Sequence, residues 1–288
     1  MLALLACVAH GADIDVLLSE PTAVYGEAAA SLKAELPGHN FQVFDVRDAP
    51  AAGQTSRIVV AFGQRALQRA LAERETSTIV AGLITARTHE SMAAALRGRR
   101  ATVVILDQPY ARQIDLVRAA LPGSKRIGIV HSPEGESALA GLSSAAREAG
   151  LSVVSESVSG STELHAALTR LLPRCDLLLA IPDNLVYNQA TLPNILLTAY
   201  RAGKPLIGFS PFYVRGGALA AVYSSPQQIG RQVAEAVNRA LAGGSLPATQ
   251  SARYFSVGVN PTVARSLGLS LDSESDLAGK LEQMGGDQ

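Results

Sequence analysis

Polar residues and glycines follow several short apolar runs that have the composition of β-strands. Ser19 closes the first such run, residues 14–19, and Asp183 follows the run at residues 176–181. When strands are parallel, ligands bind beyond their carboxyl ends. We therefore take the residues at these ends, with nearby aromatic side chains, as candidate ligand contacts: Ser19, Gly63, Gln64, Gln108, His131, Asp183, Asn184, Phe209, Ser210, Tyr213 and Tyr223.

Asp183 is the strongest of these candidates. It follows an apolar run and Pro182, which predicts a position at the rim of a sheet, where a carboxylate could bind the ammonium or hydroxyl group of a ligand. Aspartate and asparagine are also preferred N-cap residues of helices. Asp183 could therefore cap the following segment instead, and with Asn184 beside it one residue could cap while the other binds.

Gly63 and Gln64 stand between the run at 57–62 and a helical pattern at 64–74. Backbone N–H groups at the N-terminus of such a helix can hold an anion or a carboxylate. A tight strand-to-helix turn explains the same residues equally well. Gln108 carries both a donor and an acceptor, so it could contact a ligand, or it could simply precede a helix that starts near Pro109.

The motifs of common catalytic sites are missing from the sequence. No G-x-G-x-x-G follows the first strand, and neither G-x-x-x-x-G-K-[ST] nor the nucleophile motif G-x-S-x-G occurs. The five histidines lack the spacing of metal ligands, and His131 is expected to be a polar residue at a sheet rim rather than a catalyst. We therefore expect a protein that is not an enzyme and that carries neither a cofactor nor a metal.

The chain alternates between β-type runs and helical periods of 10–15 residues, which is typical of parallel βαβ units. This cycle starts again at residues 125–132, so the sequence predicts an α/β protein with two doubly wound parallel-sheet lobes joined by a hinge, and a ligand in the cleft between them. We expect strands at 14–19, 41–46, 57–62, 78–83, 102–107, 126–131, 152–158, 176–181, 205–209, 218–223 and 253–259, and helices at 23–36, 64–74, 89–97, 111–121, 136–149, 161–172, 189–202, 226–241 and 262–267.

The length of the chain is consistent with two lobes. The chain has 288 residues, enough for two domains of roughly 100–150 residues each. It has 25 basic and 25 acidic residues, and no basic stripe of the kind that a nucleic-acid-binding protein shows. We expect no nucleic-acid partner.

Pro122-Gly123 is a strong helix stop and marks the expected lobe boundary. The polar tail beyond Asp272 is expected to fray.

The first twelve residues resemble the end of a secretory signal peptide. Residues 2–8 are apolar, and small residues follow at a spacing that suits cleavage. The segment at 4–7 also matches a bacterial lipoprotein box, which would make Cys7 a lipid anchor. We therefore expect a periplasmic protein or one anchored by lipid outside the cytoplasm; a fragment of a first apolar element is the alternative. The other cysteine, Cys175, is expected to be a small apolar core residue.

An ordered series of short segments resembles the substrate-binding proteins of bacterial ABC transporters, in the group related to tryptophan/tyrosine-type binding proteins. The resemblance covers roughly residues 14–271. The segments that carry it are Asp107-Gln108-Pro109, residues 121–128 (LPGSKRIG), Ile181-Pro182-Asp183-Asn184, residues 199–205 (AYRAGKP), Gly208-Phe209-Ser210, residues 214–218 (VRGGA), Ile229-Gly230-Arg231-Gln232, Val259-Asn260-Pro261 and residues 264–269 (ARSLGL).

This resemblance implies a type I periplasmic-binding-protein fold with three crossovers between the lobes. It places residues 13–121 and 224–252 in lobe 1 and residues 122–223 and 253–288 in lobe 2, after a signal-like segment at 1–12. The implied protein is an exported solute-binding protein, a monomer, that delivers a small molecule to an ABC permease in the inner membrane. Two rivals share the fold: a doubly wound enzyme that uses the same cleft, and the ligand-sensing domain of a regulator or receptor.

Aromatic residues are concentrated in one stretch of the chain. Six of the thirteen tyrosines and phenylalanines fall within residues 187–223. Tyr187 and Tyr200 are expected in the core, whereas Phe209, Phe212, Tyr213 and Tyr223 could form one wall of the cleft, Phe212 and Tyr213 from a loop. With Asp183 for an ammonium group and the Gly63-Gln64 turn for a carboxylate, this wall predicts an amino-acid ligand. The alternative is that the rings simply pack between strand ends and helices.

Overall fold

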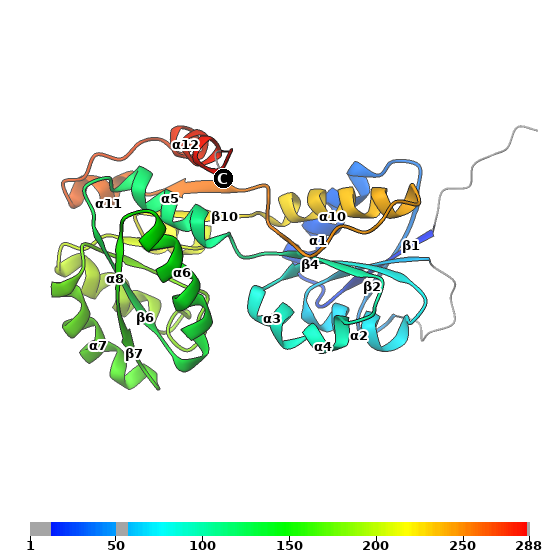
Figure 1. The fold of residues 1–288 in the computed structure, drawn as a ribbon, viewed down its shortest axis with the longest axis horizontal. Helices are drawn as coiled ribbons and strands as arrows, with labels where there is room; N and C mark the ends of the chain where they lie inside the picture. The colour runs from blue at the N-terminus through cyan, green and yellow to red at the C-terminus, as the bar shows by residue number, and fades with distance from the viewer. Residues whose placement is uncertain (1–12, 50–56, 287–288) are drawn as a thin grey trace, which may run out of the picture. The chain divides into compact units, whose positions relative to one another are not determined.

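Figure 1 shows the fold in a computed structural model, which describes residues 13–49 and 57–286. The expected signal-like segment at 1–12, with Cys7, lies outside the described residues. The fold can therefore be compared with the sequence-based expectations from the first strand onward.

The chain forms two compact units. Unit 1 contains the residues up to Asp107 and the segment Ser224–Tyr254, and unit 2 contains Gln108–Tyr223 and the residues from Phe255 onward. The chain thus passes from one unit to the other at three places, which we call the first, second and third crossings in chain order.

Unit 1 contains a six-stranded parallel sheet in the order β11-β5-β4-β3-β1-β2. Its strands are β1 (Asp13–Leu18), β2 (Asn40–Asp45), β3 (Ile58–Phe62), β4 (Thr78–Ile84), β5 (Ala101–Ile105) and β11 (Gln250–Ser251). Its helices are α1 (Ala23–Glu35), α2 (Gln64–Glu73), α3 (Ala86–Ser91), α4 (Ala93–Leu96) and α10 (Pro226–Leu241).

Helices cover both faces of this sheet, which explains why β3 is apolar at every position. Val60 packs with residues of α1 and α10, and Val59 packs with residues of α2. In Figure 1, α1 and α10 lie together on one side of the sheet and α2 to α4 on the other. Parallel strands that are buried on both faces read as continuous apolar runs in a sequence. The carboxyl ends of these strands are therefore held by two independent apolar layers.

Unit 2 contains a second six-stranded sheet, in the order β12-β10-β9-β8-β6-β7, and only the β10–β12 pair is antiparallel. Its strands are β6 (Arg126–His131), β7 (Ser152–Ser157), β8 (Leu177–Leu179), β9 (Leu206–Gly208), β10 (Ala220–Tyr223) and β12 (Ser256–Val259). Its α-helices are α5 (Tyr110–Ala120), α6 (Glu136–Glu148), α7 (Leu164–Leu171), α8 (Leu192–Arg201), α9 (Pro211–Gly216), α11 (Pro261–Ser266) and α12 (Glu274–Gly286).

The first boundary between the units lies about one helix earlier than the sequence predicted. We expected residues 108–121 in lobe 1, but α5 belongs to unit 2 because Ile114, Leu116 and Val117 are buried in the apolar core of that unit. Pro122-Gly123 ends the helix without ending the unit. The last boundary also differs slightly, since unit 1 extends to Tyr254 instead of residue 252.

Three expectations about single elements were wrong. The tail beyond Asp272 forms helix α12, whose Leu277 and Leu281 are buried in the core of unit 2. Phe212 and Tyr213 lie in helix α9 and not in a loop. Tyr200 was expected in the core, but it is one of the exposed large side chains, on the outer face of α8.

Among the described residues, no helix is both long enough and apolar enough to cross a membrane.

Candidate functional site

The carboxyl ends of β1 and β3 bring two of the predicted site residues together in unit 1. The two strands pair in parallel as far as Leu18↔Phe62, so Ser19 and Gly63 are neighbours. The backbone N–H of Ser19 donates to the Phe62 carbonyl at 3.0 Å, and its Oγ accepts the N–H of Ala66 at 3.0 Å. Ser19 is thereby buried against the first turn of α2.

Tyr25 of α1 completes this corner, and the sequence analysis missed it. A Cβ on Gly63 would lie 2.6 Å from Ser19 Oγ and 2.8 Å from the Tyr25 hydroxyl, and Gly63 has a φ of +87°. Only glycine therefore fits this close approach. Burial, with Glu20 adding to it, raises the pKa of Tyr25, so its hydroxyl keeps its proton at neutral pH and can donate a hydrogen bond. The residue lies within a helical pattern, and no local signal marks it.

Charged groups stand beside the same corner. Gln64, the first residue of α2, is exposed, and Arg65 follows it and forms an ion pair with Glu20. The N-terminus of a helix carries partial positive charge, and a guanidinium favours carboxylates through paired hydrogen bonds. The corner thus places the side chains of Ser19, Tyr25 and Arg65 beside the positive end of α2.

In unit 2, Asp183 likewise follows the carboxyl end of a strand, β8, but its carboxylate already has backbone partners. Oδ2 accepts the N–H of Ser132 at 2.6 Å, and Oδ1 accepts the N–H groups of Leu185 at 3.1 Å and Val186 at 3.3 Å. Asp183 is only 1% exposed. The geometry therefore gives it the capping role that the sequence left open beside binding, and it ties the turn after residue 181 to the end of β6.

His131 and Asn184 lie near this turn in different settings. His131 ends β6 and is buried, with Nδ1 3.0 Å from the Ser132 carbonyl oxygen. A Cβ on Gly135 would come within 2.8 Å of Asp183 Oδ2 and 3.2 Å of the His131 Cβ, so these residues form one tight cluster. Asn184 is exposed. Of the two adjacent candidates, Asp183 stabilises the turn and Asn184 is the one in solvent.

The predicted aromatic wall is largely part of the unit 2 core. The Phe209 and Tyr213 ring centroids are 4.5 Å apart, and Tyr213 also contacts Tyr187 and the exposed Phe212. Tyr213 is buried, its hydroxyl donates to the Tyr187 carbonyl at 3.3 Å, and burial raises its pKa. Ser210 precedes this cluster as the N-cap residue of α9. Phe209 and Phe212 are the rings that keep exposed surface.

The last two candidates lie at crossings. Gln108 is the first residue of unit 2, and its Oε1 accepts a hydrogen bond from Arg112 at 2.8 Å. Tyr223 is the last residue of unit 2 before the second crossing and is half-buried. Its ring lies close to Gly258 of the paired strand β12. Both side chains have partners within unit 2.

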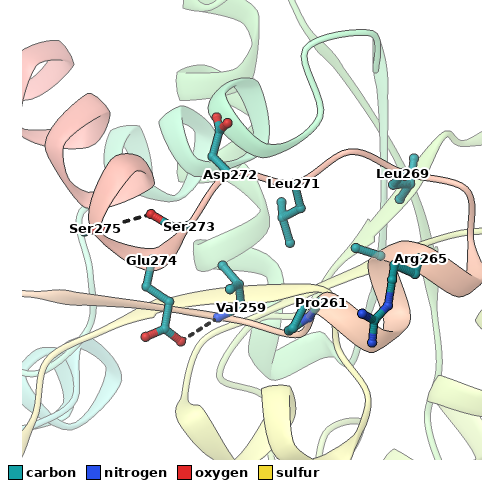
Figure 2. Close-up of a pocket in the computed structure, with 10 residues that line it drawn as sticks. Val259, Pro261, Arg265, Leu269, Leu271, Asp272, Ser273, Glu274 and Ser275 are labelled. Atoms are coloured by element: carbon teal, nitrogen blue, oxygen red, sulfur yellow. Dashed lines mark hydrogen bonds between the residues drawn. The ribbon is translucent and has the colours of Figure 1, made fainter.

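A separate cavity of about 770 Å³ lies in the C-terminal part of unit 2 (Figure 2). Its wall includes Val259, which pairs with Ala220 at the start of β10. The cavity therefore lies toward the amino end of β10. Glu274 accepts the N–H of Val259 at 3.1 Å and thereby fixes α12 against the edge strand β12. The cavity is lined by Val259, Pro261, Ala264, Arg265, Leu269, Leu271, Asp272, Ser273, Glu274 and Ser275, and by none of the predicted contacts.

No group of three or more histidine, cysteine, aspartate or glutamate side chains could hold a metal ion within residues 13–49 and 57–286. The chemistry of the strand ends is that of hydrogen bonding and charge: hydroxyl groups, backbone N–H groups and one exposed guanidinium–carboxylate pair. Such groups recognise a small polar molecule by complementary hydrogen bonds.

Residues 53–278 match the ABC transporter substrate binding protein family. The match spans well over half of the chain, so the protein belongs to this family. No individually curated protein matches the chain at a significant level.

Solved structures share the fold over nearly the whole chain. A ligand-free, open substrate binding protein with adhesive properties from Clostridium difficile is 16% identical, with a TM-score of 0.77, and the match covers 91% of this chain and 96% of that one. A Streptococcus pneumonia ABC domain in complex with L-Trp is 17% identical (TM-score 0.63; 94% and 98% covered). A Vibrio cholerae conserved domain protein is 21% identical (TM-score 0.62; 93% and 98% covered).

The predicted fold class is thereby confirmed. Two mostly parallel sheets flanked by helices, with the chain crossing between the units three times, make up a type I periplasmic-binding-protein-like fold.

Proposed function

We propose that this protein is the exported solute-binding component of an ABC importer. It captures a small molecule between its two units and presents it to a permease in the inner membrane. The family match over residues 53–278 carries the proposal, and the Ser19–Tyr25–Gly63 corner supports it by supplying hydrogen-bonding groups at a strand edge. In this proposal the protein acts as a monomer, performs no catalysis and binds no nucleic acid.

Capture works by closure of the two units around the ligand. Each unit supplies part of the contacts, so a ligand that touches both stabilises the closed state by its difference in affinity for the two states. In unit 1 we assign ligand contact to Ser19, Gly63 and Gln64. In unit 2 we assign it to the strand-end residues Gln108, His131, Asp183, Asn184, Phe209, Ser210, Tyr213 and Tyr223.

An amino acid is the ligand class that we propose. The start of α2 with Arg65 suits a carboxylate, and the exposed parts of Phe209 and Phe212 suit an apolar side chain. One structural relative was solved with L-Trp and another with myo-inositol, so the fold accepts both amino acids and polyols. The corner with Arg65 favours the amino acid because a polyol has no carboxylate.

A panel of amino acids, sugars and small amines, followed by thermal unfolding, tests the ligand class. A ligand present at 100 times its Kd should stabilise the protein by about 2.7 kcal/mol, which appears as a raised Tm. Native mass spectrometry of protein purified from its own host looks for the ligand independently. Stabilisation by a sugar and by no amino acid would refute the amino-acid assignment, and turnover of a bound compound would favour the rival enzyme.

The matched variants Gly63→Ala and Gly38→Ala test the site. Both glycines have a φ of +87°, a conformation that other residues rarely adopt, so both variants strain the backbone. Nothing lies within 4 Å of a Cβ on Gly38, whereas a Cβ on Gly63 would clash with Ser19 and Tyr25. We expect Gly63→Ala to weaken ligand binding about tenfold or more and Gly38→Ala to leave it unchanged. Equal affinities in the two variants would remove the corner from the site.

A further inference from the structure

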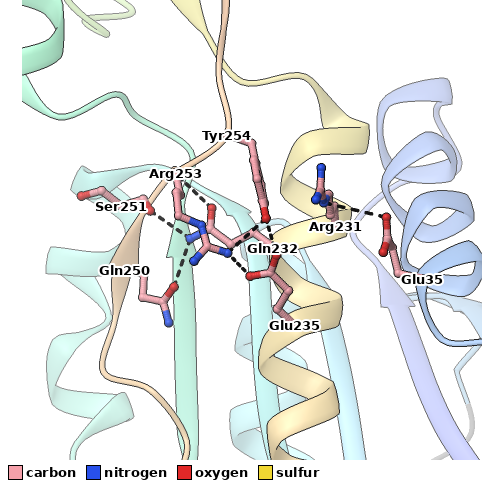
Figure 3. Close-up of polar contacts among 8 residues, drawn as sticks. All are labelled: Glu35, Arg231, Gln232, Glu235, Gln250, Ser251, Arg253 and Tyr254. Carbon is pink, nitrogen blue, oxygen red and sulfur yellow. Dashed lines mark hydrogen bonds and ion pairs between the residues drawn. The ribbon is translucent and has the colours of Figure 1, made fainter. Parts of the chain in front are cut away.

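The segment that leads into the third crossing is bound to unit 1 as far as Tyr254, the last residue of that unit. The buried side chain of Gln232, on α10, donates to Gln250 Oε1 at 3.1 Å and to the Ser251 carbonyl at 3.0 Å, and it accepts the N–H of Arg253 at 2.8 Å. Figure 3 shows this single amide bridging three points of the outgoing segment. Residues 250–253 are therefore held along α10 and do not form a free linker.

Tyr254, the last residue of unit 1, is held on both sides of its ring. The guanidinium of Arg231 lies 4.3 Å from the ring centroid and that of Arg253 lies 4.9 Å from it. The Tyr254 hydroxyl donates to Glu235, which also pairs with Arg253 (Figure 3). Cation–π contacts and hydrogen bonds to a carboxylate are both favourable, and together they fix the ring in one orientation.

The second crossing is tied to the third. Ser224, the first residue after the second crossing, donates through its hydroxyl to the carbonyl of Tyr254 in unit 1. In unit 2, β10 and β12 stay paired up to Tyr223↔Ser256. The two segments are thus connected in each unit immediately before and after they cross.

Arg112 ties the first crossing to the third in unit 2. Its guanidinium donates to Gln108 Oε1 at 2.8 Å and lies 4.4 Å from the ring centroid of Phe255. Gln108 and Phe255 are the first residues of unit 2 after these two crossings. On the other side of the first crossing, Asp107 accepts the N–H of Ala86 at 2.7 Å within unit 1.

We propose that Tyr254 and Arg112 are positioning residues for ligand capture: they confine bending to the junctions Asp107–Gln108, Tyr223–Ser224 and Tyr254–Phe255, and they make the three crossings bend together. The inference rests on the proposed function, because only a protein that closes on a ligand needs such control. Each crossing residue that loses these contacts gains conformations, and closure on a ligand must remove them again at a cost in entropy. The contacts of Tyr254 and Arg112 therefore narrow the range of conformations of the ligand-free protein. They raise its affinity for the ligand although neither residue touches the ligand.

Distance distributions between the units, measured in ligand-free protein by single-molecule fluorescence, test the proposal. Dyes go on exposed helix positions, Gln68→Cys in unit 1 and Ser266→Cys in unit 2, in a Cys7→Ser background, since Cys175 is buried. The test variants are Tyr254→Leu and Arg112→Gln. The matched controls are Tyr200→Leu, an exposed tyrosine on α8, and Arg118→Gln, an exposed arginine on the same helix as Arg112.

We expect each test variant to widen the distance distribution at least twofold and each control to leave it as in the parent protein. Hydrogen exchange of the Arg253 amide should accelerate about tenfold or more in Tyr254→Leu, while the amides of β3 keep their protection. Distributions of unchanged width in the test variants would overturn the proposal, and so would equal widening in the controls.

A conservative variant keeps the test possible if Tyr254→Leu does not fold. Tyr254→Phe keeps the ring between the two arginines and loses only the hydroxyl bond to Glu235, so it should widen the distribution less than Tyr254→Leu. If Tyr254→Leu does not fold, Tyr254→Phe decides alone: any widening supports the proposal and none refutes it. Because no ligand is needed, failure to find a ligand would count against the proposed function and leave this result untouched.

Discussion

At the scale of single residues, Asp183 shows how one residue type serves two purposes at a strand end. A carboxylate after an apolar strand can bind a ligand or stabilise the turn that follows. The local sequence pattern is the same for both roles, so it does not distinguish them. Here the carboxylate accepts three backbone N–H groups and is 1% exposed. Its contribution to binding stays a prediction, whereas its contribution to the turn follows from the contacts.

We predict that Asp183→Ala destabilises the protein by about 3 kcal/mol. The variant leaves buried N–H groups without their acceptor, and each such loss costs about 1–3 kcal/mol. Urea unfolding measures the change, and Asn184→Ala, at the exposed neighbouring position, is the control that should change stability by less than about 0.5 kcal/mol. A similar small change in both variants would show that the turn does not depend on Asp183.

Residue-level features of the corner in unit 1 were only partly predictable. Ser19 and Gly63 could be found because strand ends are visible in the sequence as breaks in apolar runs. Tyr25 could not, because it reaches the corner from a neighbouring helix and its own surroundings are those of any helical residue. The Asp183 contacts were likewise invisible, since its partner Ser132 is 51 residues away in the chain.

At the scale of elements, strongly periodic segments were predictable, whereas one very short helix and one mostly polar helix were not. Helix α10 was expected at about 226–241 and has these bounds, and Ser225 forms a capping box with Gln228 at its start. Helix α9 was missed although Ser210-Pro211 is an ordinary helix start, because only one turn and a half follows it. Helix α12 was missed because the segment is mostly polar and is stabilised by Leu277 and Leu281, which only the folded unit buries.

Asp176 links two strands of unit 2 and makes a pH-dependent contribution to stability. Its Oδ2 accepts the N–H groups of Lys125 and Arg126 at 2.9 Å each, and Oδ1 pairs with the Arg126 guanidinium at 3.1 Å. The hydrogen bond from Lys125 is the largest cause that lowers the pKa of Asp176 below its usual 3.8, and the bonds from Arg126 add to it. The starts of β6 and β8 are thus joined by one ionised carboxylate.

We predict that Asp176→Asn destabilises the protein at neutral pH by about 1–2 kcal/mol, as loss of a charged hydrogen-bond acceptor does. A lowered pKa in the folded state means that this stabilisation is present above the unfolded value and is lost as pH falls through the folded value. The difference between parent and variant in urea unfolding should therefore be constant from pH 7 to 5 and shrink below pH 4. A difference that does not change between pH 7 and pH 3 would contradict the assignment.

At the scale of the whole molecule, the repeat of strand-helix cycles predicted two units, and the family resemblance predicted where the chain returns between them. The exact boundary required the structure, because a helix stop such as Pro122-Gly123 says where α5 ends and not which core it joins. The buried residues of α5 decide that question, and α5 packs on α12, which comes from the far end of the chain.

Separate cores predict separate unfolding. Within the part of the chain that the structure describes, the apolar core of unit 2 contains no residue of unit 1, and the two apolar clusters of unit 1 contain none of unit 2. We therefore expect calorimetry of the ligand-free protein to depart from two-state behaviour, with two overlapping transitions. Leu67→Ala in α2 and Leu168→Ala in α7 each remove a fully buried side chain from one core, at a cost of about 3 kcal/mol.

Each variant should lower the Tm of one transition by roughly 10 °C and leave the other in place. A ligand that contacts both units is released when the first unit unfolds, so it raises the Tm of the first transition, and a saturating ligand should move that transition up to merge with the second. A single transition in ligand-free protein that both variants shift equally would mean that the units unfold as one. In that case the three crossings would couple the stability of the two units, and the two cores would not unfold independently.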